Sequence, residues 1–204
     1  MTWRSKLMNF IPTLFLGLIF YSFVYFVIST SLIALVAFLI CIYFVPVCAF
    51  RIHNFLSPLV YGFSNLSEKK YSSWWGGHQI QGIYATFPVF ERVLRIIPGF
   101  YSGWLRLWGS TVGKNVYWTP MIEIHDRGSV HIGDDVIFGH KVECYCHIIK
   151  PRHDGLRLYL QPIVIGSRTF VGAGARIGPG VQIDEDTFVP LLTDLAINQQ
   201  HGES

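Results

Sequence analysis

The sequence predicts an all-β domain, a parallel β-helix of hexapeptide repeats, preceded by a two-helix transmembrane hairpin and amphipathic interfacial helices. Three observations lead to this fold class. Residues 10–50 contain no Asp, Glu, Lys, Arg or His, residues 52–110 interleave aromatic side chains with arginines, and apolar residues recur every six positions after residue 111. We therefore expect three parts: a hairpin over residues 1–51, an interfacial region over 52–110 and the β-helix over 111–204.

The hairpin follows from composition and length. The 204 residues are 51% hydrophobic and only 14% charged, whereas about 25% charged residues is usual in soluble domains. A membrane span needs roughly 20 apolar residues, so the uncharged run suits two spans. The hydroxyl residues Ser29, Thr30 and Ser31 mark the turn between them. A cleaved signal peptide would have a shorter apolar core, of roughly 7 to 15 residues, and a small-residue cleavage site.

The flanking charges predict the orientation of the hairpin. Arg4 and Lys6 precede it, Arg51, Lys69 and Lys70 follow it, and its tip carries no charge. Because cytoplasmic flanks are enriched in Lys and Arg, we expect a multi-pass protein of the cytoplasmic (inner) membrane with its C-terminal domain in the cytosol. The net charge of +3 suits contact with an anionic bilayer surface. The sequence has no run of basic residues that would indicate binding to nucleic acid.

Aromatic and cationic residues together are typical of a membrane interface. Within residues 52–110, Phe90, Val93 and Ile97 recur at helical spacing, while Glu91 and Arg95 take the other side. Pro98-Gly99 ends this helix, and a second amphipathic segment surrounds Arg106. The apolar stripe is expected either to contact lipid or to pack against the β-helix, and both alternatives bury the same face.

The repeat determines the fold of the C-terminal part. An apolar residue followed by a small or turn-prone one recurs every six residues, at Ile132-Gly133, Phe138-Gly139, Ile165-Gly166, Val171-Gly172, Ile177-Gly178, Ile183-Asp184 and Val189-Pro190. The same phase begins upstream at Val112-Gly113 and is reset by a two-residue slip near Val130. Six residues suit one flat strand and a corner, so three units form a triangular coil of about 18 residues that stacks on its neighbours.

A second inward position lies four residues after the first. Small or β-branched residues occupy it, at Val116, Val136, Val142, Ile148, Ala175 and Val181. The corners carry Gly, Asn and Asp, which accept the unusual backbone angles of such turns. A flexible linker would also be rich in glycine, but it would show no phase for Ile and Val.

The four cysteines predict no disulfide. Cys41 and Cys48 lie in the second predicted span, and Cys144 and Cys146 lie in the domain expected in the cytosol, where thiols stay reduced. Cys144 and Cys146 also lack the Cys-x-x-Cys spacing of structural zinc sites, so we expect them to pack rather than to bind metal.

This pattern resembles the hexapeptide-repeat acyltransferase superfamily and its membrane-anchored members. The likeness covers residues 112–195 and includes two segments, Trp108-Gly109-Ser110-Thr111-Val112-Gly113-Lys114-Asn115-Val116-Tyr117-Trp118 and Pro162-Ile163-Val164-Ile165-Gly166. The resemblance implies a left-handed β-helix, a homotrimer and acyl-CoA, in particular acetyl-CoA, as co-substrate, with no metal expected.

The repeat is interrupted between Cys144 and Ile165, where residues 150–158 do not fit regular coils. In the family such a loop follows the histidine that activates the acceptor and helps to wall the cleft between subunits. His147 matches that histidine, and its phase predicts an outward position. His140 is a candidate for a second polar residue of the wall.

A carboxylate or carbonyl usually orients such a base, and the candidates Glu143, Asp154 and Glu123 stay open. Backbone amides of Gly172-Ala173-Gly174 are expected to bind the oxyanion or the pantetheine arm of the donor.

The resemblance and the predicted membrane hairpin together imply a membrane-bound O-acyltransferase with His147 as general base. The acceptor would be a hydroxyl or an amine of a lipid-like molecule: a glycolipid, an undecaprenyl-linked sugar, a hydroxylated carotenoid or a polyene or polyketide-like product. One alternative is a non-enzymatic trimeric membrane scaffold. Another is a zinc protein resembling γ-carbonic anhydrases, suggested by the candidate ligands His125, His131, His140, His147 and His153.

Overall fold

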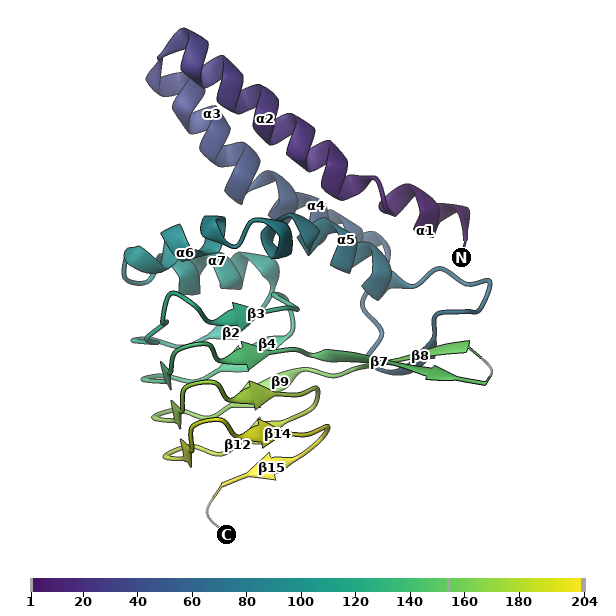
Figure 1. Cartoon of the computed structure of the whole chain (residues 1–204), viewed down its shortest axis with the longest axis vertical. Coiled ribbons are helices and arrows are strands. Elements are labelled where there is room, and N and C mark those ends of the chain that lie inside the picture. Colours follow the sequence, from purple (N-terminus) through teal and green to yellow (C-terminus); the bar gives the residue numbers. More distant parts are fainter. Residues whose placement is uncertain (1, 154, 203–204) are drawn as a thin grey trace. The chain divides into compact units, whose positions relative to one another are not determined.

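The structure, a computed structural model, describes residues 2–153 and 155–202. The chain forms two compact units, one of residues 1–60 and 68–90 and the other of residues 61–67 and 91–204. Figure 1 shows the helices of the first unit in purple to teal and the coils of the second in teal to yellow. The division at residues 51 and 110 stays a prediction.

The first unit is helical. Its helices are α1 (Trp3–Met8), α2 (Ile11–Ser29), α3 (Leu32–Tyr43), α4 (Val45–Leu56) and α5 (Ser73–Thr86). The predicted turn at Ser29–Ser31 is confirmed: Thr30 has a left-handed backbone (φ 48°), and the Ser31 hydroxyl accepts the Ala34 N–H at 3.2 Å to cap α3. The Tyr84 hydroxyl of α5 donates to the Ile42 carbonyl of α3 at 2.6 Å, which links α5 to the helical hairpin of α2 and α3.

Two segments of this unit are long and apolar enough to cross a bilayer. They are Trp3–Ser29, with a mean hydropathy of 2.1, and Leu32–Leu56, with a mean hydropathy of 2.8. Only 17% and 22% of their most apolar windows are buried inside the protein. Phe20 is 66% exposed and Ile33 is 82% exposed. Most of the surface of these two segments is therefore not covered by the rest of the chain.

The second unit is a parallel β-helix of three sheets, whose short strands stack coil upon coil (Figure 1). The first sheet has the order β13 (Phe188–Val189), β10 (Phe170–Val171), β5 (Ile137–Phe138). The second has the order β14 (Asp194–Leu195), β11 (Arg176–Ile177), β6 (Glu143–Cys144), β3 (Glu123–Ile124). The third has the order β15 (Gln200–His201), β12 (Gln182–Ile183), β9 (Ile163–Ile165), β4 (Val130–Ile132), β2 (Thr111–Val112). The predicted β-helix is thus present, and its left-handedness stays a prediction.

The strand register confirms the repeat of six residues. Val164 pairs with Gln182, and Gln182 pairs with Gln200, so each coil takes 18 residues. One residue in each six has a left-handed backbone in this part of the chain: Arg168, Gly174, Gly180, Asp186, Leu192 and Asn198. Such residues turn the chain sharply between flat strands, which explains why the corners favour Gly, Asn and Asp.

The first coil is longer by the predicted slip. Thr111 pairs with His131, so this coil takes 20 residues. The extra residues form a turn in which the Ser129 N–H donates to the Asp126 carbonyl at 3.0 Å. Asp126, Arg127 and Ser129 are all buried in this turn. The slip therefore carries polar side chains into the protein.

The predicted core is confirmed along the regular coils. The first inward position is buried at Ile132, Phe138, Cys144, Ile165, Val171, Ile177, Ile183 and Val189, and the second at Val136, Val142, Ala175 and Val181. Val116, near the end of the prism, is only half-buried. The expected inward position of Ile148 is wrong, because the chain has already left the coil at this point.

The interruption of the repeat is a β-hairpin. His131 pairs with Val164, 33 residues later, so one coil carries an insertion. The hairpin strands β7 (His147–Arg152) and β8 (Gly155–Leu160) are antiparallel, and β1 (Gly62–Asn65) joins β8 on its other side. The predicted exit from the regular coils is confirmed, and Figure 1 shows the hairpin projecting from the prism.

Helices α6 (Val89–Ile96) and α7 (Phe100–Trp108) are confirmed near the predicted positions. At the first coil, the Trp118 indole donates to the Ser102 hydroxyl at 2.8 Å, so α7 covers this end of the prism. The predicted separation of an apolar from a polar face is confirmed for α6. Glu91 is buried, and the exposed residues of this region are apolar: Val93, Ile96, Ile97 and Phe100. The polar face is the buried one because Glu91 forms an ion pair with Arg127, 36 residues further along the chain.

Candidate active site

His147 lies where the chain leaves the regular coil and enters the hairpin. It is the first residue of β7, and it pairs with Leu160 at the end of β8. The side chain is 17% exposed, so it is more covered than the predicted outward position implies. Immediately before it, the Cys146 carbonyl accepts the Gln161 N–H at 2.8 Å, which closes the neck of the hairpin. The histidine thus stands on a backbone that is hydrogen-bonded on both sides of the insertion.

Asp126 is the carboxylate that contacts His147. Its Oδ2 atom lies 2.7 Å from His147 Nδ1, and the same oxygen accepts the Cys146 N–H at 2.9 Å. The Asp126 side chain is 6% exposed. A carboxylate buried to this degree is stable only where hydrogen bonds replace water. The two donors at Oδ2 supply such bonds and fix the direction of the carboxylate toward the ring.

The contact determines the histidine tautomer. An ionised carboxylate only accepts hydrogen bonds, so Nδ1 of a neutral His147 must carry the proton. The lone pair is then on Nε2, the atom that can take a proton from an acceptor hydroxyl. A buried carboxylate at Nδ1 also stabilises the imidazolium that forms when Nε2 is protonated. The pair therefore has the geometry of an oriented general base.

The turn that holds Asp126 is fixed by buried polar contacts on its far side. Arg127 Nε donates to Glu91, and Arg95 forms a second ion pair with Glu91 at 2.7 Å. The Ser110 hydroxyl donates to the Arg127 carbonyl at 2.7 Å and accepts the Val130 N–H at 3.1 Å. These contacts fix the backbone on both sides of the two inserted residues, and so they fix the position of the Asp126 backbone from which its side chain extends.

Cys146 lies beside the pair, but its thiol is not suited to act as a nucleophile. Burial, together with the charge of Asp126, raises the pKa of the Cys146 thiol well above its ordinary value. The thiol also lies 3.2 Å from the Ser129 carbonyl, to which it donates. Because the thiolate is the reactive form, Cys146 packs in the core, as the sequence predicts.

The acids expected beside His147 lie elsewhere or outside the described residues. Glu143 on β6 is aligned with Glu123 on β3 and with Arg176 on β11, so the three share one face of a sheet of the prism. Asp154 lies outside the described residues. The roles of Glu143, Glu123 and Asp154 stay predictions, and the carboxylate at His147 is one that the sequence reasoning missed.

A signal for Asp126 existed in the sequence. Residues in neighbouring coils lie above one another, and the first coil takes 20 residues because of the slip. Counting back 20 residues from Cys146 leads to Asp126, the residue that accepts the Cys146 N–H. The change of phase predicts the slip, but it does not by itself show that Asp126 of the slip faces His147.

The segment Gly172-Ala173-Gly174 lies at a coil corner next to His140. The Gly172 N–H donates to the Val189 carbonyl at 2.8 Å, and the Gly174 N–H donates to the His140 carbonyl at 2.8 Å. Two of the three amides therefore hold coils together. A role of this segment in donor binding, and of His140 in the wall of the cleft, stays a prediction.

The remaining histidines have separate surroundings. His125 Nε2 lies 3.7 Å from Glu123, while His131 Nδ1 lies 2.7 Å from the Thr111 hydroxyl. Over residues 2–153 and 155–202, no three His, Cys, Asp or Glu side chains are grouped so as to hold a metal ion within one chain.

Comparison with known proteins gives remote structural likenesses. No family model and no curated protein matches the sequence. A maltose O-acetyltransferase from Clostridium difficile 630 is similar over 52% of this chain and 71% of its own, at 17% identity and a TM-score of 0.40.

A galactoside acetyltransferase, solved in complex with coenzyme A, is similar over 55% of this chain and 74% of its own, at 18% identity and a TM-score of 0.35. A serine acetyltransferase isoform 3 from Entamoeba histolytica, in complex with cysteine, is similar over 82% of this chain and 62% of its own, at 11% identity and a TM-score of 0.30. The β-helix described above rests on the strand pairing of this chain itself.

Proposed function

We propose that this protein is an acyltransferase that moves an acyl group from acyl-CoA, in particular acetyl-CoA, to a hydroxyl or amine of a lipid-like acceptor. His147 is the general base and Asp126 orients it. The observation that carries the proposal is the 2.7 Å contact between His147 Nδ1 and the buried Asp126 carboxylate at the neck of the hairpin. A β-helix alone does not imply this chemistry, because one fold hosts many functions.

The reaction balances with these two residues and two substrates. The acceptor oxygen attacks the thioester carbonyl while Nε2 of His147 takes its proton. The new C–O bond forms, the C–S bond of the thioester breaks, and the leaving thiolate of CoA takes the proton back from the imidazolium. Asp126 stays ionised and stabilises the imidazolium between these steps. The enzyme is therefore returned to its starting protonation state.

The proposal is tested by transfer of label from acetyl-CoA and from a long-chain acyl-CoA into the total lipid extract of membranes that carry the protein. Wild-type membranes should yield a labelled lipid, and membranes with His147→Ala should yield none. A labelled lipid that appears equally with both proteins would remove His147 from the mechanism. No labelled lipid with either protein would favour the scaffold.

The proposed location is the cytoplasmic membrane, with two spans and the β-helix in the cytosol, where acyl-CoA is available. Two features support it. The two apolar N-terminal segments are largely unburied, and α6, α7 and the turn between them expose Val93, Ile96, Ile97 and Phe100 while Glu91 is buried. An apolar face turned outward suits lipid contact better than packing on the β-helix.

The membrane proposal has its own test. The protein should stay with membranes after alkaline carbonate extraction, and a reporter fused to the C-terminus should be active only in the cytosol. A soluble protein after extraction would exclude the spans, and a periplasmic reporter would exclude the orientation. The homotrimer is likewise a proposal, and its mass in detergent measures it directly: three chains support it, and a monomer contradicts it.

A further inference from the structure

A cavity at the start of α7 is lined by cations that the transfer mechanism does not use. Its volume is about 760 Å³, within the range of about 300–1,000 Å³ that is usual for ligand sites. The turn between α6 and α7 lines one part of it, and the corner of the first coil at Lys114 and Asn115 lines another. All of its lining residues belong to the second unit, so the cavity is formed within this unit.

The first turn of α7 contributes backbone N–H groups to this cavity. Gly99, Tyr101 and Ser102 are among its lining residues. Gly99 precedes the helix with a left-handed backbone (φ 81°) and has no side chain that could cap α7. The Phe100 N–H donates to the Ile97 carbonyl, but within the part of the chain that the structure describes the N–H groups of Tyr101 and Ser102 have no acceptor. Uncapped amides at the positive end of a helix favour an anion.

Arg95 adds a buried donor without an acceptor at the same cavity. Its side chain is only 3% exposed, and it lines the cavity. The two terminal nitrogens donate to Glu91 at 2.7 Å and to the Pro120 carbonyl at 2.9 Å. Its buried Nε–H has no partner among residues 2–153 and 155–202. Because a buried polar group without a hydrogen bond is costly, the site favours a ligand that brings an acceptor.

Two further cations line the cavity, Arg106 and Lys114. The Arg106 guanidinium is held in place because it donates to the carbonyls of Val112 and Gly113 at 2.8 and 2.7 Å. Lys114 is exposed. Its N–H donates to the Asp134 carboxylate at 2.6 Å, but none of the described residues that line the cavity is Asp or Glu. The lining is therefore positively charged and suits an anion.

The rim of the cavity is apolar on the side of the helices. Ile96 and Ile97 line it and are exposed, and the neighbouring Phe100 is exposed as well. A free phosphate ion would leave these side chains in water, whereas the acyl chains of a lipid would cover them. The cavity thus combines donors for an anionic group with an apolar surface directly beside them.

We propose that this cavity binds the phosphate of an anionic phospholipid, so that the β-helix unit holds a membrane lipid by its headgroup. The phosphate oxygens accept the free amides of α7 and the Arg95 Nε–H, and the charges of Arg106 and Lys114 balance the phosphate. The acyl chains lie against the exposed apolar residues of the rim. The proposal rests on the proposed membrane location and not on acyl transfer. Such a site fixes the β-helix unit at the bilayer surface in addition to the two spans.

Calorimetric titration of the full chain in an uncharged detergent with dioctanoyl phosphatidylglycerol tests the proposal. The variant Gly99→Asp places a carboxylate before α7, at a position where an added Cβ meets nothing within 4 Å. It should raise the Kd by about tenfold or more, because the carboxylate repels the phosphate and occupies the positive end of the helix. Gly99→Asn is the matched control, since Asn and Asp accept a left-handed backbone similarly, and it should keep the Kd within about threefold of the wild type. Equal Kd values for the two variants would overturn the proposal.

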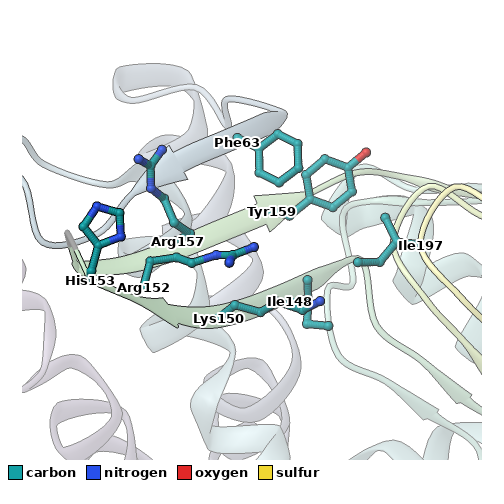
Figure 2. A pocket seen from close by; sticks show the side chains of 8 residues that line it. All are labelled: Phe63, Ile148, Lys150, Arg152, His153, Arg157, Tyr159 and Ile197. Atoms are coloured by element: carbon teal, nitrogen blue, oxygen red, sulfur yellow. The ribbon is translucent and has the colours of Figure 1, made fainter.

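A second pair of variants tests the cation. Lys114→Gln should raise the Kd by about tenfold, because it removes a charged hydrogen-bond donor from the site. Lys150 is an equally exposed cation on strand β7, where Figure 2 shows it in a different cavity, of about 470 Å³. Lys150→Gln should therefore leave the Kd unchanged. An equal rise in both variants would mean that the lipid is attracted only by the overall positive charge, which overturns the site.

Three further probes identify the source of the phosphate. Glycerol 3-phosphate, which has no acyl chains, should bind more weakly than dioctanoyl phosphatidylglycerol, and dioctanoylglycerol, which has no phosphate, should not bind. Equal affinity for glycerol 3-phosphate would make the cavity a site for soluble phosphates, and equal affinity for dioctanoylglycerol would make it an apolar contact. Competition by acetyl-CoA would assign the cavity to the phosphates of the donor. Each of these three results would overturn the proposal.

The lipid site and the proposed function fail separately. His147→Ala should bind dioctanoyl phosphatidylglycerol with the wild-type Kd while it loses acyl transfer. Binding by a wild-type protein that transfers no acyl group would refute the enzyme and support the site, whereas transfer by a protein that does not bind this lipid would refute only the site. Binding by a chain that alkaline carbonate releases from membranes would refute the spans and support the site.

Discussion

The substitution Asp126→Asn removes the negative charge of the proposed dyad and keeps the size of the side chain. Two hydrogen bonds of the carboxylate, from His147 and from the Cys146 N–H, end on the same oxygen, Oδ2. An asparagine with its amide oxygen at this position accepts both bonds. The fold and the His147 tautomer should therefore survive, and the variant loses the negative charge that stabilises the imidazolium.

The expected effect follows from the geometry of the pair. With charge centres about 4 Å apart and an effective dielectric constant of about 20, the charges attract by about 4 kcal/mol. Each 1.36 kcal/mol of transition-state stabilisation is about tenfold in rate. Because the attraction is gained only when His147 is protonated, Asp126→Asn should lower kcat by about 10² to 10³ and leave the KM for acetyl-CoA nearly unchanged.

The assay compares initial rates of acyl transfer for wild type, Asp126→Asn and a matched variant, Asp186→Asn. Asp186 lies on an exposed coil corner, where it pairs with Arg168, and its substitution should leave the rate within a factor of about two, because exposed ion pairs contribute little. A kcat for Asp126→Asn within about threefold of the wild type, with the thermal unfolding midpoint retained, would refute the role of Asp126.

Three further predictions concern stability. Glu91→Ala should lower the free energy of unfolding by about 3–5 kcal/mol, because it removes the carboxylate shared by two buried arginines; denaturant titration in detergent measures this, and a loss below about 1 kcal/mol contradicts it. Gly139→Ala should destabilise the coils, because its Cβ would lie 2.5 Å from the Ala173 backbone nitrogen. In Gly103→Ala of α7 the added Cβ meets nothing within 4 Å, so this variant should raise the free energy of unfolding by up to about 1 kcal/mol. A higher unfolding midpoint for Gly139→Ala than for Gly103→Ala would contradict this packing. Burial raises the pKa of the Cys144 thiol from 9.0 to about 12, so its contribution to stability is complete below pH 9 and is lost between pH 9 and about 12 as the unfolded thiol ionises first; Cys144→Ala should flatten this alkaline decline in the unfolding free energy, and an equal slope in both proteins would contradict it.

The β-helix was predictable from sequence because its determinants are local and repeated. A buried residue every sixth position and a left-handed corner in each unit leave a phase that can be followed by inspection, as at Ile165, Val171 and Ile177. The hairpin turn at Thr30 was predictable for a similar reason, since three hydroxyl residues interrupt an otherwise apolar run. In both cases the type of a residue, apolar or polar, is enough to predict whether it is buried or lies in a turn.

The orientation of α6 was not predictable in this way. Helical periodicity separates an apolar from a polar side, but it does not say which side is buried. The deciding partner of Glu91 is Arg127, 36 residues away. A buried ion pair thus placed the polar side inward, and the apolar residues Val93 and Ile96 are left exposed.

The candidate site was predictable in part. His147 is expected from the family resemblance, which implies an acceptor-activating histidine just before the loop that interrupts the repeat. Its partner required the register of the coils: Asp126 precedes His147 by 21 residues, and the two meet only because a two-residue slip lengthens the first coil. The antiparallel pairing of β7 with β8, as of Lys150 with Arg157, does not follow from the expected loop, because it depends on contacts between residues without a repeated pattern.

The most direct test of the account is release of free CoA by the purified protein in detergent, given acetyl-CoA and a total lipid extract. The account predicts release that requires the lipid, is lost in His147→Ala and is kept in His131→Ala, whose ring contacts the Thr111 hydroxyl rather than a carboxylate. Release that persists in His147→Ala, or that is as fast without lipid as with it, would contradict an acyltransferase that uses this dyad on a lipid-like acceptor.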